Sequence, residues 1–307
     1  MTPNCKVGRG VVALSWLALW ACGNGEGASP ISPTQSGGMS RVAGCEITGS
    51  TPGTPVMALL SHTVAVGAAA DGVTITDAAE VLRAGSVPDG VRLPDGSIGV
   101  YYVNGQTDGV WMGRLSGSTL TPVSAITIDG VLRPQGVVDP DATSIGGRIR
   151  LAYLNGFGPP ASGAERTMCL AESADGLVFQ TLAAAWRLGA NATETDPSIV
   201  QLQNGAWLMA VSRGTSTLMG RSTDGLSFAQ YDTLTFGGVP ELALTTDGRV
   251  RLYVCSGAGI QSYVSADGGS PWTFESPVVT PAMIGRPIVC DPSYVAGAGL
   301  FVFKTAS

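Results

Sequence analysis

The chain has 307 residues, of which 44% are hydrophobic, 13% are charged and 43 are glycine, and its formal net charge is −6. Apolar runs recur along its whole length, which excludes a disordered protein. Short apolar runs with abundant glycine favour strands and tight turns over helices, and large all-β units often fold as one domain at this length. The acidic balance excludes a nucleic-acid-binding surface, which needs clustered lysine and arginine.

The N-terminus predicts a signal peptide of the bacterial lipoprotein type over residues 1–21. Two basic residues precede the apolar run VVALSWLALWA (11–21), which is too short to span a membrane as a helix. The residues LWAC (19–22) resemble the lipobox. This resemblance implies that Cys22 is lipidated and becomes the mature N-terminus. An ordinary secretory signal with an incidental cysteine is the alternative.

A flexible tether is expected over residues 22–45, because GNGEGASPISPTQSGG (23–38) has no apolar periodicity. Gly23 stands where an aspartate would signal retention in the inner membrane, so the resemblance points to an outer-membrane lipoprotein on its periplasmic or surface face. The leader carries two of the 17 basic residues and none of the 23 acidic ones, which leaves a charge of −8. We therefore expect membrane contact only through the lipid.

Export places the remaining cysteines in a compartment that permits disulfides. They are Cys45, Cys169, Cys255 and Cys290, and none shows the CxxC spacing of a zinc or thioredoxin site. Four cysteines allow three pairings.

A repeat runs through the chain, marked by a proline beside an acidic residue. The five segments are VPDGVRLPDGSIGVYYV (87–103), VDPDATSIGGRIRLAYL (138–154), TDPSIVQLQNGAWLMAV (195–211), VPELALTTDGRVRLYVC (239–255) and CDPSYVAGAGLFVF (290–303). Each has an apolar run, a turn such as TDG or QNG, and a second apolar run, which is a strong hairpin signal. A third and a fourth run follow in most units. Four strands in about 50 residues are typical of a propeller blade.

A second repeated motif is Ser-x-Asp-Gly followed by an aromatic residue, as in SADGLVF (173–179), STDGLSF (222–228) and SADGGSPW (265–272). Asp and Gly suit a tight turn, and the Ser and Asp oxygens can accept backbone N–H bonds. We interpret the motif as the turn between the third and fourth strands of a blade, with the aromatic side chain covering the sheet, and not as a catalytic group.

The fifth unit ends after two strands, and the N-terminal segment HTVAVGAAADGVTITDAAEVL (62–82) reads as the missing third and fourth strands. Joining these remainders closes a ring. The sequence therefore predicts an all-β fold over residues 46–307: a five-bladed β-propeller of four-stranded antiparallel blades, whose last blade is closed by N-terminal strands. In this topology Cys255 ends the second strand of blade 4 and Cys290 begins the first strand of blade 5, which predicts a Cys255–Cys290 disulfide and leaves Cys45 with Cys169.

The five-unit pattern resembles the propellers of glycoside hydrolases related to arabinanases, xylosidases and fructosidases. The Ser-x-Asp-Gly turns are more loosely similar to the sialidase Asp-box, although they are one residue shorter. The resemblance implies inward-facing carboxyl groups, one ionised and one protonated. On three successive blades, Asp139, Asp196 and Glu241 reproduce the Asp-Asp-Glu order of those enzymes and are the candidate catalytic residues.

Two observations oppose catalysis. Asp139, Asp196 and Asp291 precede their prolines, whereas Asp89 and Glu241 follow theirs. We expect this offset to turn some of them away from the axis. Aspartate before proline is also a common way to begin a strand.

Further ligand contacts are predicted at the axial mouth. The candidates are Asp89, Asp291, Arg286 and Trp186, the last because it is expected in a loop where it can stack on a sugar. His62 is the only histidine, which excludes a His-cluster metal site and disfavours a Ser-His-Asp triad. No cofactor is predicted; Ca²⁺ near the carboxylates is left open, without EF-hand spacing to support it.

Two functions remain open on the sequence. The first is a carbohydrate-related one, in which a monomeric, lipid-anchored propeller binds or hydrolyses a glycan at its axis. The second is a non-catalytic binding or scaffold lipoprotein of the cell envelope.

Overall fold

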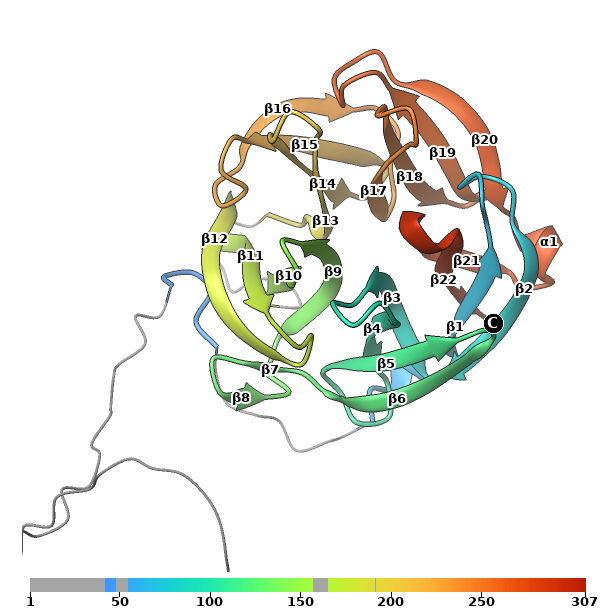
Figure 1. Cartoon of the computed structure of the whole chain (residues 1–307), viewed down its shortest axis with the longest axis horizontal. Coiled ribbons are helices and arrows are strands. Elements are labelled where there is room, and N and C mark those ends of the chain that lie inside the picture. Colours follow the sequence, from blue (N-terminus) through green and yellow to red (C-terminus); the bar gives the residue numbers. More distant parts are fainter. Residues whose placement is uncertain (1–41, 48–54, 157–164, 191) are drawn as a thin grey trace, which may run out of the picture. The chain divides into compact units, whose positions relative to one another are not determined.

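The computed structural model describes residues 42–47, 55–156, 165–190 and 192–307. The signal peptide, Cys22 and most of the predicted tether lie outside these residues. The described chain is nearly all strand, and five sheets stand around a common axis (Figure 1). The fold is a five-bladed β-propeller, as the sequence predicts.

Each blade is numbered by its place along the chain, and its strands are given from the axis outward. Blade 1 contains β3 (Gly85–Arg92), β4 (Ile98–Asn104), β5 (Val110–Ser116) and β6 (Thr119–Ala125). Blade 2 contains β9 (Val137–Ile145), β10 (Arg148–Asn155), β11 (Glu165–Ser173) and β12 (Val178–Ala190). Blade 3 contains β13 (Thr195–Gln201), β14 (Trp207–Arg213), β15 (Ser216–Ser222) and β16 (Ala229–Leu234). Blade 4 contains β17 (Pro240–Leu244), β18 (Val250–Ser256), β19 (Gly259–Ser265) and β20 (Thr273–Val279).

Blade 5 joins the two ends of the propeller. Its order is β21 (Ile288–Val295), β22 (Leu300–Ala306), β1 (His62–Ala68) and β2 (Thr76–Arg83). β1 pairs antiparallel with β22 along its whole length, from His62 opposite Ala306 to Ala68 opposite Leu300. The N-terminal strands therefore close the ring in the way that the incomplete fifth repeat requires.

Blade 2 adds a short hairpin to its four strands. The hairpin contains β7 (Thr127–Ile128) and β8 (Val131–Leu132), and β7 pairs in parallel with β12. The turn residue Asp129 holds it there, because its carboxylate accepts hydrogen bonds from the backbone N–H and the hydroxyl of Thr181, at 2.9 and 2.7 Å.

The core lies between the blades. The described residues form five apolar clusters, one at each junction between neighbouring blades. Both faces of a sheet are therefore covered, which explains why second strands such as β4 read as continuous apolar runs instead of alternating ones.

The Ser-x-Asp-Gly motif forms the predicted turn. In blade 2, Ser173 Oγ accepts the Gly176 N–H at 2.9 Å, and Asp175 accepts the N–H groups of Leu177 and Val178 at 2.8 and 2.9 Å. Gly176 has φ +77° and presents its carbonyl to Tyr101 Oη of blade 1 at 2.7 Å. Each such turn is thus also a contact to the preceding blade.

Both predicted disulfides are present. Cys255 in β18 is joined to Cys290 in β21, and Cys45 is joined to Cys169 in β11, with Cα–Cα distances of 5.0 and 6.0 Å. The second bond fastens residues 42–47 to blade 2.

Within the described residues, helical structure is confined to short turns: η1 (Met57–Leu59), α1 (Pro281–Ile284) and η2 (Ala296–Ala298). No helix in the described ranges is both long and apolar enough to cross a membrane.

Candidate functional site at the propeller axis

Five inner strands surround the axis, and each contains its repeat proline. The residue before the proline is Val87, Asp139, Asp196, Val239 or Asp291, and the residue after it is Asp89, Asp141, Ser198, Glu241 or Ser293. We call Asp139, Asp196 and Asp291 the pre-proline tier, and Asp89, Asp141 and Glu241 the post-proline tier. Both tiers, with the prolines between them, line a cavity of about 20 Å³, which exceeds the roughly 10 to 15 Å³ that one water needs.

The expectation that some of these carboxyl groups turn away from the axis is wrong. Every predicted acidic residue lines the axial cavity. The two positions differ by two residues, and strand alternation alone does not set their directions, because the strand register shifts beside each pre-proline aspartate.

The pre-proline residues have an unusual backbone. Asp139, Asp196 and Asp291 have φ of 52°, 51° and 50°, and the strand register shifts beside each of them. Val87 has φ 45° in the same position of blade 1, although a β-branched residue rarely adopts it. Because Val87 carries no carboxyl group, the bulge belongs to the repeat architecture and does not by itself mark a catalytic residue.

The post-proline residues connect the blades through a closed circle of hydrogen bonds. Each side chain accepts the N–H of the second residue after the proline in the next blade. The five bonds are Asp89 from Ala142 (2.6 Å), Asp141 from Ile199 (3.0 Å), Ser198 from Leu242 (2.9 Å), Glu241 from Tyr294 (3.4 Å) and Ser293 from Gly90 (2.9 Å). These residues therefore have an architectural role whatever else they do.

No cation pairs with the post-proline carboxyl groups in the described structure. Few of these three groups can therefore be ionised at the same time. One oxygen of each of Asp89, Asp141 and Glu241 lies within 4.8 Å of the others. Burial and the neighbouring carboxylates raise the pKa of Asp89 and Glu241 well above their usual values, and burial raises the pKa of Asp141 to about 6. The hydrogen bond between Glu241 and Asp141 raises the pKa of Glu241 and lowers the pKa of Asp141. The proton therefore lies on Glu241 and the negative charge on Asp141.

The pre-proline tier contains a cation. Lys304 Nζ lies 2.7 Å from Asp291 Oδ2. Burial alone would lower the pKa of Lys304, but Asp291 outweighs it and the pKa rises. Asp139 accepts the Asp196 N–H at 3.3 Å, and burial raises the pKa of Asp139 to about 6. Burial and the charge of Asp139 raise the pKa of Asp196 well above its usual value.

A larger cavity of about 380 Å³ opens on the side where the inner strands end. Asp141 and Glu241 are the two tier residues that line it. Its walls come from the second halves of the inner strands and the residues that follow them, and its polar or aromatic side chains include Thr143, Gln201 and Tyr294.

The predicted catalytic set is therefore divided. Glu241 reaches the cavity, whereas Asp139 and Asp196 lie in the pre-proline tier and do not line it. Asp141, beside Asp139, was not chosen from the sequence. Its position after the proline, which it shares with Asp89 and Glu241, was the signal that could have identified it.

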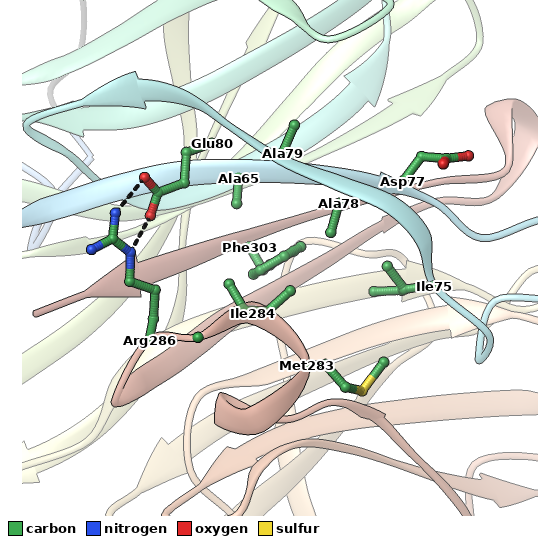
Figure 2. Close-up of a pocket in the computed structure, with 11 residues that line it drawn as sticks. Ala65, Ile75, Asp77, Ala78, Ala79, Glu80, Met283, Ile284, Arg286 and Phe303 are labelled. Atoms are coloured by element: carbon green, nitrogen blue, oxygen red, sulfur yellow. Dashed lines mark hydrogen bonds and ion pairs between the residues drawn. The ribbon is translucent and has the colours of Figure 1, made fainter.

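The two non-acidic ligand candidates lie away from the axis. Trp186 is in the middle of β12, not in a loop, and it is buried at the junction of blades 2 and 3 with its ring against Gly220. Arg286 follows α1 at the rim, where it makes a bidentate ion pair with Glu80 (Figure 2). Neither side chain lines an axial cavity, and the expectation that Trp186 lies in a loop is wrong.

His62, the first residue of β1, is hydrogen-bonded to Ser86 Oγ at 2.8 Å. Burial, and secondarily Lys304, lower its pKa. Asp89, Asp141 and Glu241 each place one oxygen within 4.8 Å of the others, and the Ca²⁺ expectation stays a prediction.

Comparison with known proteins gives likeness of architecture only. No protein-family model and no curated protein matches the chain. Among solved structures, an arabinanase from Bacillus subtilis has a TM-score of 0.49 at 11% identity, over 72% of this chain and 93% of that one. A β-xylosidase/α-arabinofuranosidase of glycoside hydrolase family 43 from a compost metagenome has 0.48 at 13%, over 84% and 88%. A protein of unknown function from Dyadobacter fermentans has 0.48 at 15%, over 77% and 82%.

Proposed function

We propose that this protein is a carbohydrate-binding propeller whose ligand enters the 380 Å³ axial cavity. The observation that carries the proposal is the pairing of Asp141 and Glu241 on the wall of that cavity. Glu241 and Asp141 share one proton, which leaves the pair with one negative charge, and their carboxyl oxygens can accept hydrogen bonds from ligand hydroxyl groups. A cavity of this size lies within the range of about 300 to 1,000 Å³ that small-ligand sites occupy.

The charge of the cavity selects a neutral ligand. Its only arginine, Arg92, already donates to the carbonyl oxygens of Gly96 and Gly297, at 2.9 and 2.6 Å. A carboxylated or phosphorylated sugar would meet the charge of Asp141 without a free cation to balance it. Neutral sugars, which carry many hydroxyl groups, fit these polar contacts.

Binding is favoured over hydrolysis by the spacing of the carboxyl groups. Retaining glycosidases hold their two carboxyl groups about 5 to 5.5 Å apart, and inverting ones about 6.5 to 9.5 Å apart. Here Asp141 and Glu241 are hydrogen-bonded to each other, and their oxygens lie within 4.8 Å. This direct contact is closer than either spacing. Hydrolysis remains a second candidate, because the pair has the protonated and ionised members that such chemistry needs.

The N-terminal signal supports a place in the cell envelope. We propose that Cys22 is lipidated and holds the propeller at the outer membrane through the tether. Mass spectrometry of the protein from a bacterial envelope should detect a diacylglyceryl group on wild type and not on Cys22→Ser. A wild-type chain without the lipid would contradict this part of the proposal.

The first experiment is a glycan array with the full chain, together with a screen of chromogenic glycosides. Glu241→Gln keeps the size and hydrogen-bonding atoms of the side chain but removes its acid. Glu165→Gln changes an exposed rim carboxylate and serves as the matched control. We expect a neutral glycan to bind wild type, Glu241→Gln and Glu165→Gln alike, and to bind about tenfold or more weakly to Asp141→Ala, which removes the charged acceptor at the cavity wall.

Turnover by wild type that Glu241→Gln loses would replace binding by hydrolysis. The absence of any glycan binding would overturn the proposal and favour the scaffold role.

A further inference from the structure

A run of six apolar residues, PVMALL (55–60), comes shortly before β1. Its side chains divide between the core and the surface. Val56 and Leu59 are partly buried, and Leu59 packs against the apolar cluster at the junction of blades 1 and 2. Met57 and Leu60 are 76% and 39% exposed. The fold therefore buries only part of this run, and the rest is apolar surface.

The run lies at the face of the ring where the inner strands begin, which we call the pre-proline face. The Val56 N–H donates to the carbonyl oxygen of Gly105 at 2.7 Å, and Gly105 follows β4, whose last residue pairs with the first residue of β3. In blade 5, His62 begins β1 opposite Ala306, which also pairs with Ile288, the first residue of β21. Ile288 is 47% exposed. Exposed apolar side chains of blades 1 and 5 therefore share one face.

The chain that leads from the predicted lipid anchor reaches the same face. Residues 42–47 are joined to β11 by a disulfide. The Asn155 side chain donates to the carbonyl oxygen of Gly44 at 3.5 Å, and Asn155 pairs with Val137, the first residue of β9. The first described segment of the chain thus lies at the pre-proline face of blade 2.

The chain between the predicted anchor and this face is short. Residues 22–41 connect Cys22 to the first described residue, and a flexible chain of that length spans about 25 Å on average. A seven-residue strand such as β22 is about 23 Å long. To lay the opposite face on a membrane, the tether would have to cross that thickness and use nearly all of its reach. A lipid on Cys22 would therefore hold the pre-proline face toward the membrane.

We propose that the pre-proline face docks on the lipid bilayer through the exposed side chains of residues 55–60, with Ile288 at the same face. This inference rests on the proposed lipidation of Cys22. Contact with the boundary between headgroups and acyl chains removes Met57 and Leu60 from water, which is favourable for apolar surface. The axial cavity opens at the opposite face, so this orientation leaves it accessible to a glycan.

Apolar contact and not charge drives this docking. Arg83 and Ser307 line a small cavity with Leu60, together with Glu80 and Arg286, which form an ion pair. Groups of both signs therefore border the apolar residues, and they can remain among the lipid headgroups while Leu60 enters. Phosphatidylcholine, whose headgroup has no net charge, is accordingly the lipid chosen for the test.

The test is photocrosslinking of the full chain, purified from a bacterial envelope, in phosphatidylcholine vesicles. A fraction of the lipid carries a diazirine on its acyl chain, and peptide mass spectrometry locates the crosslinks. We expect crosslinks in the peptide that contains residues 55–60 and none in the turn at 202–206 on the opposite face. Vesicle-bound protein without crosslinks at 55–60, or with crosslinks mainly on the opposite face, would overturn the proposal.

A double variant and a matched control test the apolar contact. Met57→Ser with Leu60→Ser changes two exposed side chains and should lose most of the crosslinks at 55–60. Leu226→Ser is the control, because Leu226 is 37% exposed in the turn between β15 and β16 at the opposite face, and it should change nothing. Sedimentation without vesicles tests a second copy of the chain as the occupant. A dimer of wild type that the double variant abolishes would overturn membrane docking.

The same mass spectra separate this inference from the proposed anchor, because they show whether Cys22 carries a diacylglyceryl group. Lipid on Cys22 without crosslinks at 55–60 would refute the docking alone. A chain without the lipid would refute the anchor and the docking that rests on it. Failure of glycans to bind at the axial cavity would not affect either result.

Discussion

The two tiers of carboxyl groups at the axis come from the same repeat, two residues apart, and yet they differ in chemistry. The pre-proline tier has Lys304 within 2.7 Å of Asp291 and no access to the larger cavity. The post-proline tier has no cation in the described chain, and two of its members line that cavity. The pre-proline tier is a buried ion-pair network, and the post-proline tier is a cluster of carboxyl groups with raised pKa values.

This difference teaches that the repeat fixes where a carboxyl group stands but not what it can do. Lys304 is the only lysine outside the leader, and it forms its ion pair with the pre-proline tier, at Asp291. The presence of a cation and access to the cavity decide the role of each tier. A candidate triad that takes members from both tiers therefore mixes two environments.

The largest expected effect is the loss of the cation. Lys304→Met keeps the size of the side chain but leaves Asp291 buried without its partner, and breaking a buried pair in this way costs about 3 to 5 kcal/mol. Urea denaturation should show this loss of unfolding free energy. The double variant Lys304→Met with Asp291→Asn should recover most of it, because neither buried charge remains. Equal stability of the single variant and wild type would show that the tier is not held by this ion pair.

The pH dependence of stability is the next effect. Asp139 and Asp141 have pKa values of about 6 in the folded protein, above those of an unfolded chain. The unfolded state therefore binds fewer protons between about pH 4 and pH 6, and stability falls as pH rises through this window. Asp89, Asp196 and Glu241, whose pKa values are higher still, extend the fall upward.

Thermal unfolding should accordingly give a higher Tm near about pH 5 than near about pH 8. Asp141→Asn removes one of these titrations and should reduce the difference. A Tm that rises over this range would contradict the assigned protonation of both tiers.

A matched pair of hydroxyl deletions distinguishes the tiers by binding. Ser198 accepts the Leu242 N–H and donates to Glu241 at 2.9 Å, whereas Thr195 donates to Asp196. Ser198→Ala and Thr195→Val should each cost about 1 to 2 kcal/mol of stability. Only Ser198→Ala should weaken glycan binding, because Glu241 borders the cavity and Asp196 does not. Equal losses of affinity in both variants would mean that the tiers act as one site.

The smallest expected effect on glycan binding is that of a substitution at Trp186, which lies in the junction between blades 2 and 3. Trp186→Phe should lower stability by about 1 to 3 kcal/mol because it empties part of the junction between blades 2 and 3. Glycan affinity, measured by calorimetry on the folded variant, should stay within about twofold of wild type. A larger change would place the ligand away from the axis.

The sequence predicts the fold well because each repeat contains the strand and turn patterns of one propeller blade. The proline spacing, the hairpin turns and the incomplete fifth unit are local patterns with few structural solutions, and the pairing of β1 with β22 follows from them. The predicted disulfides also follow from the topology, once the ends of β18 and β21 are placed side by side.

The site is predicted only in part, because its chemistry depends on contacts between distant residues. That Asp139 and Glu241 both face the axis does not follow from strand periodicity, because Asp139 stands at a bulge with positive φ. The ion pairs Lys304–Asp291 and Glu80–Arg286 are not indicated by the sequence near any of these residues. The long β12 likewise carries Trp186 into a blade junction where a loop was expected.

The closure of blade 5 has a consequence for biosynthesis. Because β22 lies between β21 and β1, the ring has no complete fifth blade until the last strand of the chain has emerged and found its two neighbours. A nascent chain that ends before Leu300 presents two unpaired strand edges at once, and such edges are a template for aggregation. We expect that truncated chain to be rapidly cleaved in limited proteolysis while the full chain resists. The pairing of the seven residues of β22 with both neighbours is therefore the step that closes the ring.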